Sequence, residues 1–387
     1  MSGPLSGVRV VDLTHVLNGP FCTLLLAQLG AEVVKIEHGS GDRFRHSWLP
    51  ADVTRDGYEF IAVNSNKKGI LLDLKDPRGK QLLHRLVAKS DVVVENFATG
   101  VMERLGLGYD ALRQIKPDLI YACSRGYGEN GPYKDVRANA GTIQAITGWT
   151  DAQARQAGKP GILGPGNGDE HAGVSLCVGI LSALFHRERS GRGQKVEVSM
   201  QEANLGFMAA ILHTHFEGRQ VSCPPKACAD GYFYFHVPDM TDGLWRSLTS
   251  GLGRPELADD PRFSTEQDRR KNYHLVEDAV AEMVKDKTRA ELWDVLSTRG
   301  LSSAPVLSVA ECLEDRHLKE RNAFVELDHP EAGRVKVPAP WIRLSETPAA
   351  ITSPAPLKGQ HTQEVFGGIL GLDDDEIRAL QQERVIG

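Results

Sequence analysis

The sequence predicts an α/β protein, with a Rossmann-like large domain built on a parallel sheet and a smaller α+β domain inserted into it. Three observations lead to this prediction. Short β-branched runs alternate with helical patterns over the first 218 residues, and such alternation is typical of a parallel sheet covered by helices. A Pro- and Gly-rich stretch begins near residue 219. The chain of 387 residues is also too long for one small core.

The alternation begins with a β-α-β unit. Residues 8–14 (VRVVDLT) and 31–37 (AEVVKIE) have the composition of strands, and residues 18–30 between them have a helical pattern. Asn18 is expected to cap this helix and Gly30 to end it. The first loop lacks the G-x-G-x-x-G sequence, so the usual dinucleotide-binding turn is not predicted.

Further elements follow in the same rhythm. Helical patterns cover residues 79–90, 102–117, 169–188 and 201–218, and strands are expected at residues 91–97, 119–128 and 194–200. We therefore expect residues 1–218 to form the first part of the large domain. Residues 219–301 are expected to form the small domain with its linker. Residues 302–387 then return to the large domain and end in an amphipathic helix.

Composition argues against several classes of partner. The net charge is −6 and the Lys and Arg residues are spread along the chain, which is unlike a nucleic-acid-binding surface. No apolar run reaches the roughly 18–20 residues that span a membrane, and the N-terminus lacks the pattern of a signal peptide. A cytoplasmic protein without a membrane segment is expected. The six cysteines lack zinc-site spacing and predict reduced, mostly buried thiols and no metal.

Residues 164–173 (GPGNGDEHAG) place three chemically active side chains where a long helix is expected to begin. Asp169 is the strongest candidate nucleophile, because the chain has no G-x-S-x-G, P-loop or H-E-x-x-H sequence. A helix N-terminus stabilises a carboxylate as an anion. The simpler interpretation is that Asp169 only caps the helix, with Glu170 and His171 as solvated residues of its first turn.

The chain resembles the class III CoA-transferases from end to end. This family includes the formyl-CoA:oxalate and carnitine CoA-transferases, and it shares a superfamily with the α-methylacyl-CoA racemases. The resemblance rests on ordered stretches that include residues 7–42 (GVRVVDLTHVLNGPFCTLLLAQLGAEVVKIEHGSGD), 91–112 (DVVVENFATGVMERLGLGYDAL), 184–203 (LFHRERSGRGQKVEVSMQEA) and 356–377 (PLKGQHTQEVFGGILGLDDDEI). So many matches in one order are far more specific than any single motif.

The resemblance implies an acyl-CoA:carboxylate CoA-transferase in which Asp169 is the nucleophile. In the family, the matching aspartate forms an acyl anhydride and then an aspartyl-CoA thioester. The substrates are an acyl-CoA and a small carboxylic acid, and no permanently bound cofactor is implied. Trp48 and residues 43–46 (RFRH) are expected near the acyl group, where an arginine would suit the second carboxylate of a dicarboxylic acid. Two chains are expected to form a homodimer of interlocked rings.

The family's CoA contacts can be carried over by position. They correspond to Leu17, Asn18, His38, Leu72, Lys75, Asn96, Phe97, Arg104, Arg137 and Met200. Two of these positions depart from the family. His38 replaces the arginine of many relatives, and Leu17 replaces the glutamine of the oxalate enzymes. The glycine-rich lid of those enzymes also has no counterpart between residues 218 and 232, so the resemblance argues against oxalate as the acceptor.

Two other functions fit the resemblance less well. A racemase needs a base on each side of its substrate, but Asn139 stands where the racemases have a histidine, and an amide cannot take that proton. His171 lies on a different segment. A non-catalytic, CoA-binding partner subunit is disfavoured because Asp169 is present. The donor and acceptor acids, the need for a second subunit, and the roles of Glu170, His171 and Trp48 stay open.

Overall fold

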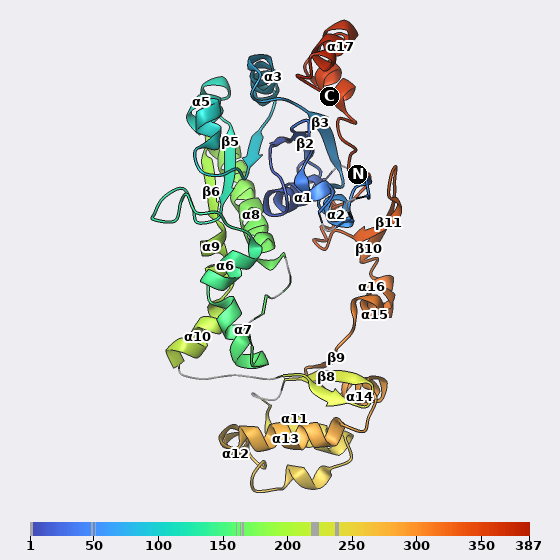
Figure 1. Ribbon diagram of the computed structural model, residues 1–387. Coiled ribbons are helices and arrows are strands. Elements are labelled where there is room, and N and C mark those ends of the chain that lie inside the picture. Colours follow the sequence, from blue (N-terminus) through green and yellow to red (C-terminus); the bar gives the residue numbers. More distant parts are fainter. Residues whose placement is uncertain are drawn as a thin grey trace. The chain divides into compact units, whose positions relative to one another are not determined.

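The computed structural model describes residues 3–47, 49–50, 52–159, 161–162, 164, 166–217, 224–236 and 240–387. The chain forms two compact units, each with its own core (Figure 1). Unit 1 comprises Met1–Ala209 and Lys319–Gly387, and unit 2 comprises Ala210–Leu318.

Unit 1 is built on a six-stranded sheet in which all neighbouring strands are parallel. The strands are β1 (Arg9–Asp12), β2 (Glu32–Glu37), β3 (Lys67–Leu71), β4 (Val92–Glu95), β5 (Ile120–Arg125) and β6 (Lys195–Ser199). Their order is β3-β2-β1-β4-β5-β6, so the strand order reverses between β1 and β4. In open α/β sheets ligands bind at the carboxyl ends of the strands at this reversal. The predicted α/β fold with a parallel sheet is confirmed.

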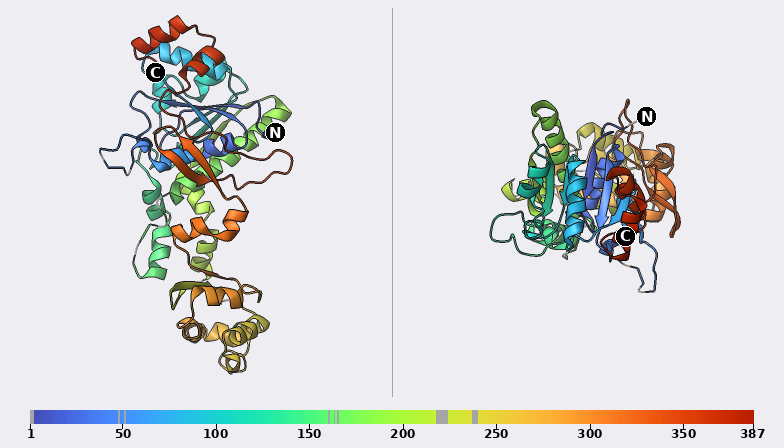
Figure 2. Two further views of the ribbon diagram at one scale, coloured as in Figure 1. Left: turned by 90° about the vertical axis from the view of Figure 1, so that its right-hand side faces the viewer. Right: turned by 90° about the horizontal axis from the view of Figure 1, so that it is seen from above.

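Successive side chains along each strand point to opposite faces of the sheet, so the sheet has a hydrophobic core on each face. Val10 of β1 packs with helices α1 (Asn18–Gln28) and α8 (Asn167–Ser190). Val11, the next residue, packs on the opposite face with α3 (Pro77–Ala88) and with α17 (Asp374–Gln382), the C-terminal helix. Figure 2 shows α17 beside α3. Both faces are buried, which accounts for the continuous apolar strand sequences.

Shorter elements complete unit 1. They are η1 (Arg43–Arg45), α2 (Tyr58–Asn64), α4 (Val101–Leu105), α5 (Tyr109–Ile115), α6 (Ala140–Ile146), α7 (Trp149–Ala157), α9 (Met200–Gly206), η3 (Gln363–Ile369) and the antiparallel pair β10 (Phe324–His329) and β11 (Gly333–Pro338). Helix α10 (Ala209–Glu217) begins at the last residue of this part of unit 1 and otherwise belongs to unit 2.

Several predicted elements differ from the structure. Asn18 does not cap α1: it is the first residue of the helix, and its side chain instead binds other side chains. The single helix expected over residues 102–117 is two helices, α4 and α5, because Gly106 adopts a φ of 72° that ends α4. Likewise residues 201–218 contain α9 and α10. Cys22, Cys123 and Cys177 are buried and free as expected, but Cys312 is only half-buried.

Unit 2 contains an antiparallel sheet of β7 (Lys226–Cys228), β8 (Gly231–Phe235) and β9 (Ser303–Pro305). Its helices are α11 (Asp242–Gly251), η2 (Pro255–Ala258), α12 (Glu266–Lys271), α13 (Tyr273–Val284), α14 (Arg289–Leu296), α15 (Val309–Glu314) and α16 (Arg316–Glu320). Trp245 lies at the centre of the core and donates from Nε1 to the Leu257 carbonyl at 3.1 Å.

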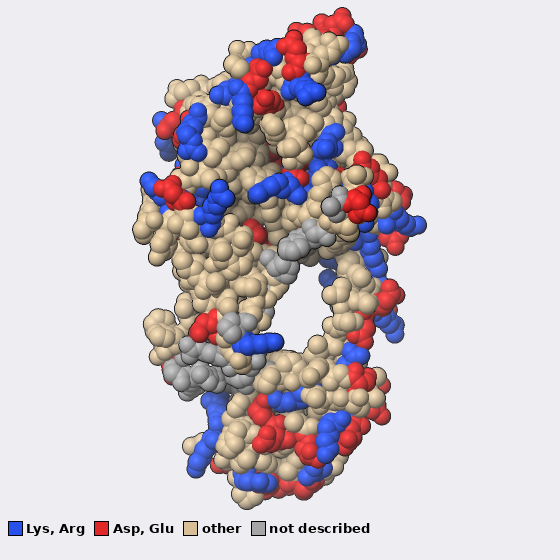
Figure 3. All heavy atoms as spheres, viewed as in Figure 1, with Lys and Arg blue, Asp and Glu red and all other residues tan. Residues whose placement is uncertain are grey.

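None of the described helices is long and apolar enough to cross a membrane. On the face drawn in Figure 3, Lys and Arg side chains are interspersed with Asp and Glu and form no continuous basic patch. The described residues also contain no group of three or more His, Cys, Asp or Glu side chains that could hold a metal ion.

Candidate active site

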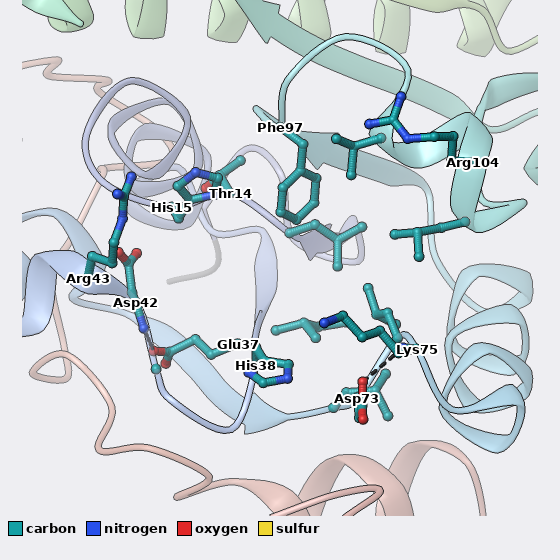
Figure 4. A pocket seen from close by; sticks show the side chains of 17 residues that line it. Thr14, His15, Glu37, His38, Asp42, Arg43, Asp73, Lys75, Phe97 and Arg104 are labelled. Carbon is teal, nitrogen blue, oxygen red and sulfur yellow. Dashed lines mark hydrogen bonds between the residues drawn. The ribbon is translucent and has the colours of Figure 1, made fainter. Parts of the chain in front are cut away.

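A cavity of about 430 Å³ lies at the reversal of the strand order (Figure 4). It is lined by residues that follow the carboxyl ends of β1, β2, β3 and β4. Five residues predicted to contact CoA line it, namely His38, Leu72, Lys75, Phe97 and Arg104. The parallel sheet therefore brings together residues that are far apart in the sequence. We call this space the switch-point cavity.

The switch-point cavity combines an apolar wall with cationic groups. Leu72 and Phe97 contribute hydrocarbon surface, and Figure 4 shows Phe97, His38 and Lys75 around a common space. Lys75 and Arg104 are exposed, and neither forms an ion pair with another described residue. Unpaired cations beside an apolar surface suit a ligand that joins phosphates to an aromatic ring.

His15 also lines the switch-point cavity and was not singled out in the sequence. Its ring lies 5.3 Å from that of Phe97, and burial lowers its pKa. The backbone of His15 is held by Asn96, which accepts from the His15 amide at 2.9 Å and donates to the His15 carbonyl at 2.8 Å. His15 follows β1 at the point where the strand order reverses, and this position could have identified it as a candidate ligand-binding residue.

A second cavity, of about 760 Å³, contains Asp169. It is lined by residues from α2, the segment Val16–Leu17, η1 and the N-terminal turns of α6 and α8. Asp169 is a first-turn residue of α8, whose N-cap is Gly166 and which has no side-chain cap. The alternative in which Asp169 caps the helix is therefore wrong. We call this space the Asp169 cavity.

The pKa of the Asp169 carboxyl is raised to about 7, chiefly by burial and to a smaller extent by the nearby Glu170, against the lowering effect of a hydrogen bond from the Ala140 backbone. The sequence led us to expect that the helix N-terminus would keep Asp169 ionised. That expectation is wrong near neutral pH, because desolvation by the surrounding segments outweighs the stabilising amides. Asp169 is thus divided between its neutral and anionic forms near pH 7, as in many reactive carboxyls.

A glycine brings the N-terminal turn of α8 against α6. A Cβ added at Gly168 would lie 2.7 Å from both Cα and the carbonyl oxygen of Ala140, closer than real Cβ atoms approach. The backbone amide of Ala140, which binds the Asp169 carboxylate, could not come so near if residue 168 had a side chain. Gly168, in the glycine-rich segment before Asp169, therefore allows the Ala140 amide to reach the Asp169 carboxylate.

The two cavities meet at the loop that follows β1. Arg43 lines both cavities, His15 lines the first, and Val16 lines the second. Val16 has a φ of 67°, which is rare for a β-branched residue. Asp42 holds this conformation by accepting from the Val16 amide at 3.1 Å and from the buried Lys35 ammonium at 3.0 Å. The junction is therefore fixed by the protein before any ligand binds.

Other predicted contact residues lie behind or outside the cavity walls. Asn18, Asn96 and Met200 line neither cavity. Asn96 donates to Asn18 Oδ1 at 2.9 Å, and Asn18 Nδ2 lies 3.2 Å from Met200 Sδ, so these three support the His15 loop. Met200 begins α9 and does not end β6. Arg137 is exposed and also lines neither cavity, whereas Leu17 lines the Asp169 cavity.

Of the residues expected near the acyl group, some line the Asp169 cavity and others do not. Arg43 and Phe44 line the Asp169 cavity, but Arg45 is buried in ion pairs with Glu37 and Asp56 at 2.6 Å each. His46 lines neither cavity. Trp48 lies outside the described residues.

His171 is half-buried and supports the first turn of α8, which differs from the solvated residue of the capping interpretation. Its ring stacks on Phe207 with centroids 4.3 Å apart, and Nδ1 lies 3.0 Å from Asn204 Oδ1. The amide nitrogen of the buried Asn204 donates to the carbonyls of Gly168 and Met200. This fixes the Asn204 oxygen toward His171, so Nδ1 of His171 carries the proton.

The raised pKa of Asp169 predicts an effect on stability. An unfolded Asp has a pKa near 3.8, so the folded carboxyl binds protons more tightly and its presence becomes destabilising as the pH rises from about 4 to about 7. Asp169→Asn should therefore raise the free energy of unfolding by up to about 4 kcal/mol at pH 8, since each pKa unit corresponds to about 1.4 kcal/mol. Urea unfolding at pH 8 and pH 4 tests this: the gain should vanish at pH 4, and an equal gain at both pH values would contradict the assignment.

The sequence pattern of CoA-transferase family III matches residues 5–362. The chain therefore belongs to CoA-transferase family III, and it is a CoA-transferase. This confirms the family and the enzyme class that the sequence resemblance implied.

Named relatives fall within the same family. The chain is 37% identical to a formyl-CoA:oxalate CoA-transferase of Streptomyces avermitilis, over 100% of each chain. It is 34% identical to a succinyl-CoA–D-citramalate CoA-transferase of Chloroflexus aurantiacus, over 99% of this chain and 98% of the relative. A CaiB/BaiF family protein from Brucella suis has a similar structure, with a TM-score of 0.84, 30% identity, and coverage of 95% of this chain and 100% of that one.

Proposed function

We propose that this protein transfers CoA from an acyl-CoA thioester to a free carboxylic acid through covalent intermediates on Asp169. The observation that carries the proposal is the meeting of two cavities at Arg43, one with unpaired cations and the other with a carboxyl of pKa about 7. The first is suited to the nucleotide end of CoA and the second to the thioester and the acids.

Binding of CoA would use the described residues of the switch-point cavity. Lys75, Arg104 and, when protonated, His38 would bind phosphate groups, while Leu72 and Phe97 would contact the adenine ring. The pantetheine arm would pass Arg43 and the fixed loop at Val16 to reach Asp169. CoA enters as part of a substrate and leaves as part of a product.

The proposed reaction is a series of acyl transfers, in each of which a nucleophile attacks a carbonyl carbon and expels another group. The Asp169 carboxylate attacks the donor thioester carbonyl and expels CoA thiolate, which forms a mixed anhydride. The thiolate then attacks the Asp169 carbonyl, which yields an aspartyl-CoA thioester and releases the donor acid. The acceptor carboxylate attacks this thioester, and the expelled thiolate takes the acceptor acyl group from the second anhydride. Asp169 is restored as a carboxylate, and no energy beyond that of the thioester is required.

The surroundings of Asp169 support these steps. Its nucleophilic form is the anion, which the Ala140 amide stabilises. Desolvation makes that anion more reactive and protects anhydrides from water. Asn139, which stands where the racemases have their histidine base, caps α6 by accepting from the Thr142 amide at 3.0 Å. Its amide oxygen is therefore engaged in structure.

A dicarboxylic acid is the substrate class that the Asp169 cavity supports. Arg43 is the only cationic side chain among the described residues that line it, and a guanidinium pairs well with a second carboxylate. Relatives are named for succinyl-CoA with citramalate or with L-malate. Leu17 offers no hydrogen bond in this cavity, which favours acids longer than oxalate and makes succinyl-CoA the first donor to test.

We also propose a homodimer. Large apolar side chains are exposed in unit 1 on α8 and on or just after α9, namely Val178, Phe185, Leu205 and Phe207. Exposed apolar side chains of this size are typical of protein interfaces, and a second copy of the chain is the proposed partner. A stable and active monomer in size-exclusion chromatography with light scattering would contradict this.

A product panel tests the proposed activity. The protein is incubated in D₂O with several acyl-CoAs and free acids, and all CoA products are measured by mass spectrometry. New acyl-CoA species that require the acceptor acid are expected, beginning with succinyl-CoA as the donor. Deuterium at the α-carbon without exchange of the acyl group would indicate racemisation and contradict the proposal.

A further inference from the structure

Glu59 has no assigned part in the transfer chemistry, yet it lines the same cavity as Asp169. It lies in the first turn of α2. Tyr58, Ala62 and Val63 of this helix line the cavity with it, as expected of positions that share one face of a helix. The backbone therefore directs Glu59 toward the space where the acids would bind.

The Oε2 atom of Glu59 is shielded from solvent and has no hydrogen-bond partner. Among the described residues that line the Asp169 cavity, Glu59 alone carries such a shielded, unpartnered side-chain atom. The Tyr58 hydroxyl beside it donates to the Lys336 carbonyl at 2.9 Å. A shielded oxygen without a hydrogen-bond partner is destabilising, and most such groups in native proteins are paired.

The nearby cation does not satisfy Glu59 either. Arg43 lines the cavity, but no ion pair or hydrogen bond joins its guanidinium to a described residue. Several of the other described lining residues are apolar, namely Val16, Leu17, Phe44, Ala62, Val63 and Ile162. A cation and a hydrogen-bond acceptor thus stand separately in a largely apolar wall, which is the usual composition of a pocket that selects its ligand by a few polar contacts.

We propose that Glu59 determines specificity by accepting a hydrogen bond from a hydroxyl group on the carbon chain of the acid. The inference rests on the proposed CoA transfer at Asp169 and names the substrate class more closely, as hydroxy acids. A hydroxyl supplies the missing partner of Oε2, whereas the same acid without the hydroxyl leaves that oxygen unpaired. Sites built to bind a hydroxyl reject analogues that lack it.

Burial raises the pKa of the Glu59 carboxyl, and this is compatible with the proposed contact. Both the neutral and the ionised carboxyl can accept from a hydroxyl. Asp169 and Glu170 line the same cavity and Arg43 is its single described cation. A carboxyl whose pKa is raised takes up negative charge less readily, which favours the entry of an anionic acid.

Matched acids and matched variants test this inference. The acceptors are pairs that differ by one hydroxyl, such as succinate with malate, glutarate with 2-hydroxyglutarate and propionate with lactate, together with aspartate as the amino analogue. One acyl-CoA donor is used throughout. The proteins are wild type, Glu59→Leu, Glu59→Gln and, as a control, Glu188→Leu, which alters an exposed residue of α8 outside both cavities. The readout is the ratio of kcat/KM for the hydroxy acid to that for its partner.

The wild type and the Glu188 variant should prefer the hydroxy acid by about tenfold or more. Glu59→Leu should abolish this preference, and Glu59→Gln should retain part of it. An unchanged ratio in Glu59→Leu, a wild type without hydroxyl preference, or a preference for aspartate would overturn the inference while leaving CoA transfer intact. Absence of any acyl-CoA product with wild type would instead refute the proposed function.

Discussion

Asp169→Asn is expected to lower kcat/KM for CoA transfer by about 10⁴-fold or more, because the amide cannot attack a thioester and form an anhydride. The substitution preserves the size of the side chain and removes an ionisable group whose pKa is about 7. In the wild type, kcat/KM should rise with pH up to about pH 7 and then level, since the anion is the reactive form. Initial rates of acyl-CoA formation over pH 5–9 measure both effects.

Glu170→Gln is the matched control for this prediction. Glu170 is adjacent in the first turn of α8 and lines the same cavity, but it has no covalent role in the proposed mechanism. Its loss removes a negative charge that raises the pKa of Asp169, so the pH profile should move to lower pH with only a small change in the maximal rate. Transfer by Asp169→Asn within tenfold of wild type would show that Asp169 is not the nucleophile.

Lys75→Ala and Arg104→Ala should each raise KM for the acyl-CoA by about tenfold, and the double variant by about 100-fold, with kcat nearly unchanged. Both side chains line the switch-point cavity and neither pairs with another described residue. Their removal therefore weakens ligand binding without breaking an internal ion pair. Steady-state kinetics at low and high salt measure the effect, which should shrink as salt screens the phosphates.

Two controls separate phosphate binding from a general loss of structure. Arg192→Ala removes an exposed arginine that lines neither cavity, and its KM should equal that of wild type. An acyl-pantetheine donor, which lacks the nucleotide, should be used equally poorly by wild type and by the double variant. Equal losses with acyl-CoA and acyl-pantetheine would argue that these residues act on the fold and not on the nucleotide.

The sheet could be predicted where its strands are continuous apolar runs, as in β1, β2 and β4. Strand β3 was missed because it begins with Lys67, Lys68 and Gly69. Lys67 is fully buried, and its ammonium lies 3.1 Å from the Asp12 carboxylate of β1. A strand that depends on such a cross-sheet ion pair has no apolar signature in its own sequence.

The sequence alone singled out Asp169, because its carboxylate is the best candidate nucleophile in the chain. Asp169 stood out locally, but its raised pKa depends on burial by segments that are distant in the sequence. Asn18, Asn96 and Met200, which the sequence predicts at the ligand, are linked to one another and to the His15 loop by hydrogen bonds, an arrangement that a matched sequence position does not reveal. Glu59 has no local signal at all, since only the folded cavity shows that its oxygen lacks a partner.

Oxygen exchange tests the central claim most directly. The acceptor acid is labelled with ¹⁸O in both carboxyl oxygens, and after turnover with acyl-CoA the peptide that contains Asp169 is analysed by mass spectrometry. If the acceptor attacks an aspartyl-CoA thioester, cleavage of the resulting anhydride leaves one ¹⁸O on Asp169 in each turnover. Label in the Asp169 carboxyl, and none in that of Glu170, is predicted. Acyl-CoA formation without ¹⁸O on Asp169 would contradict the mechanism.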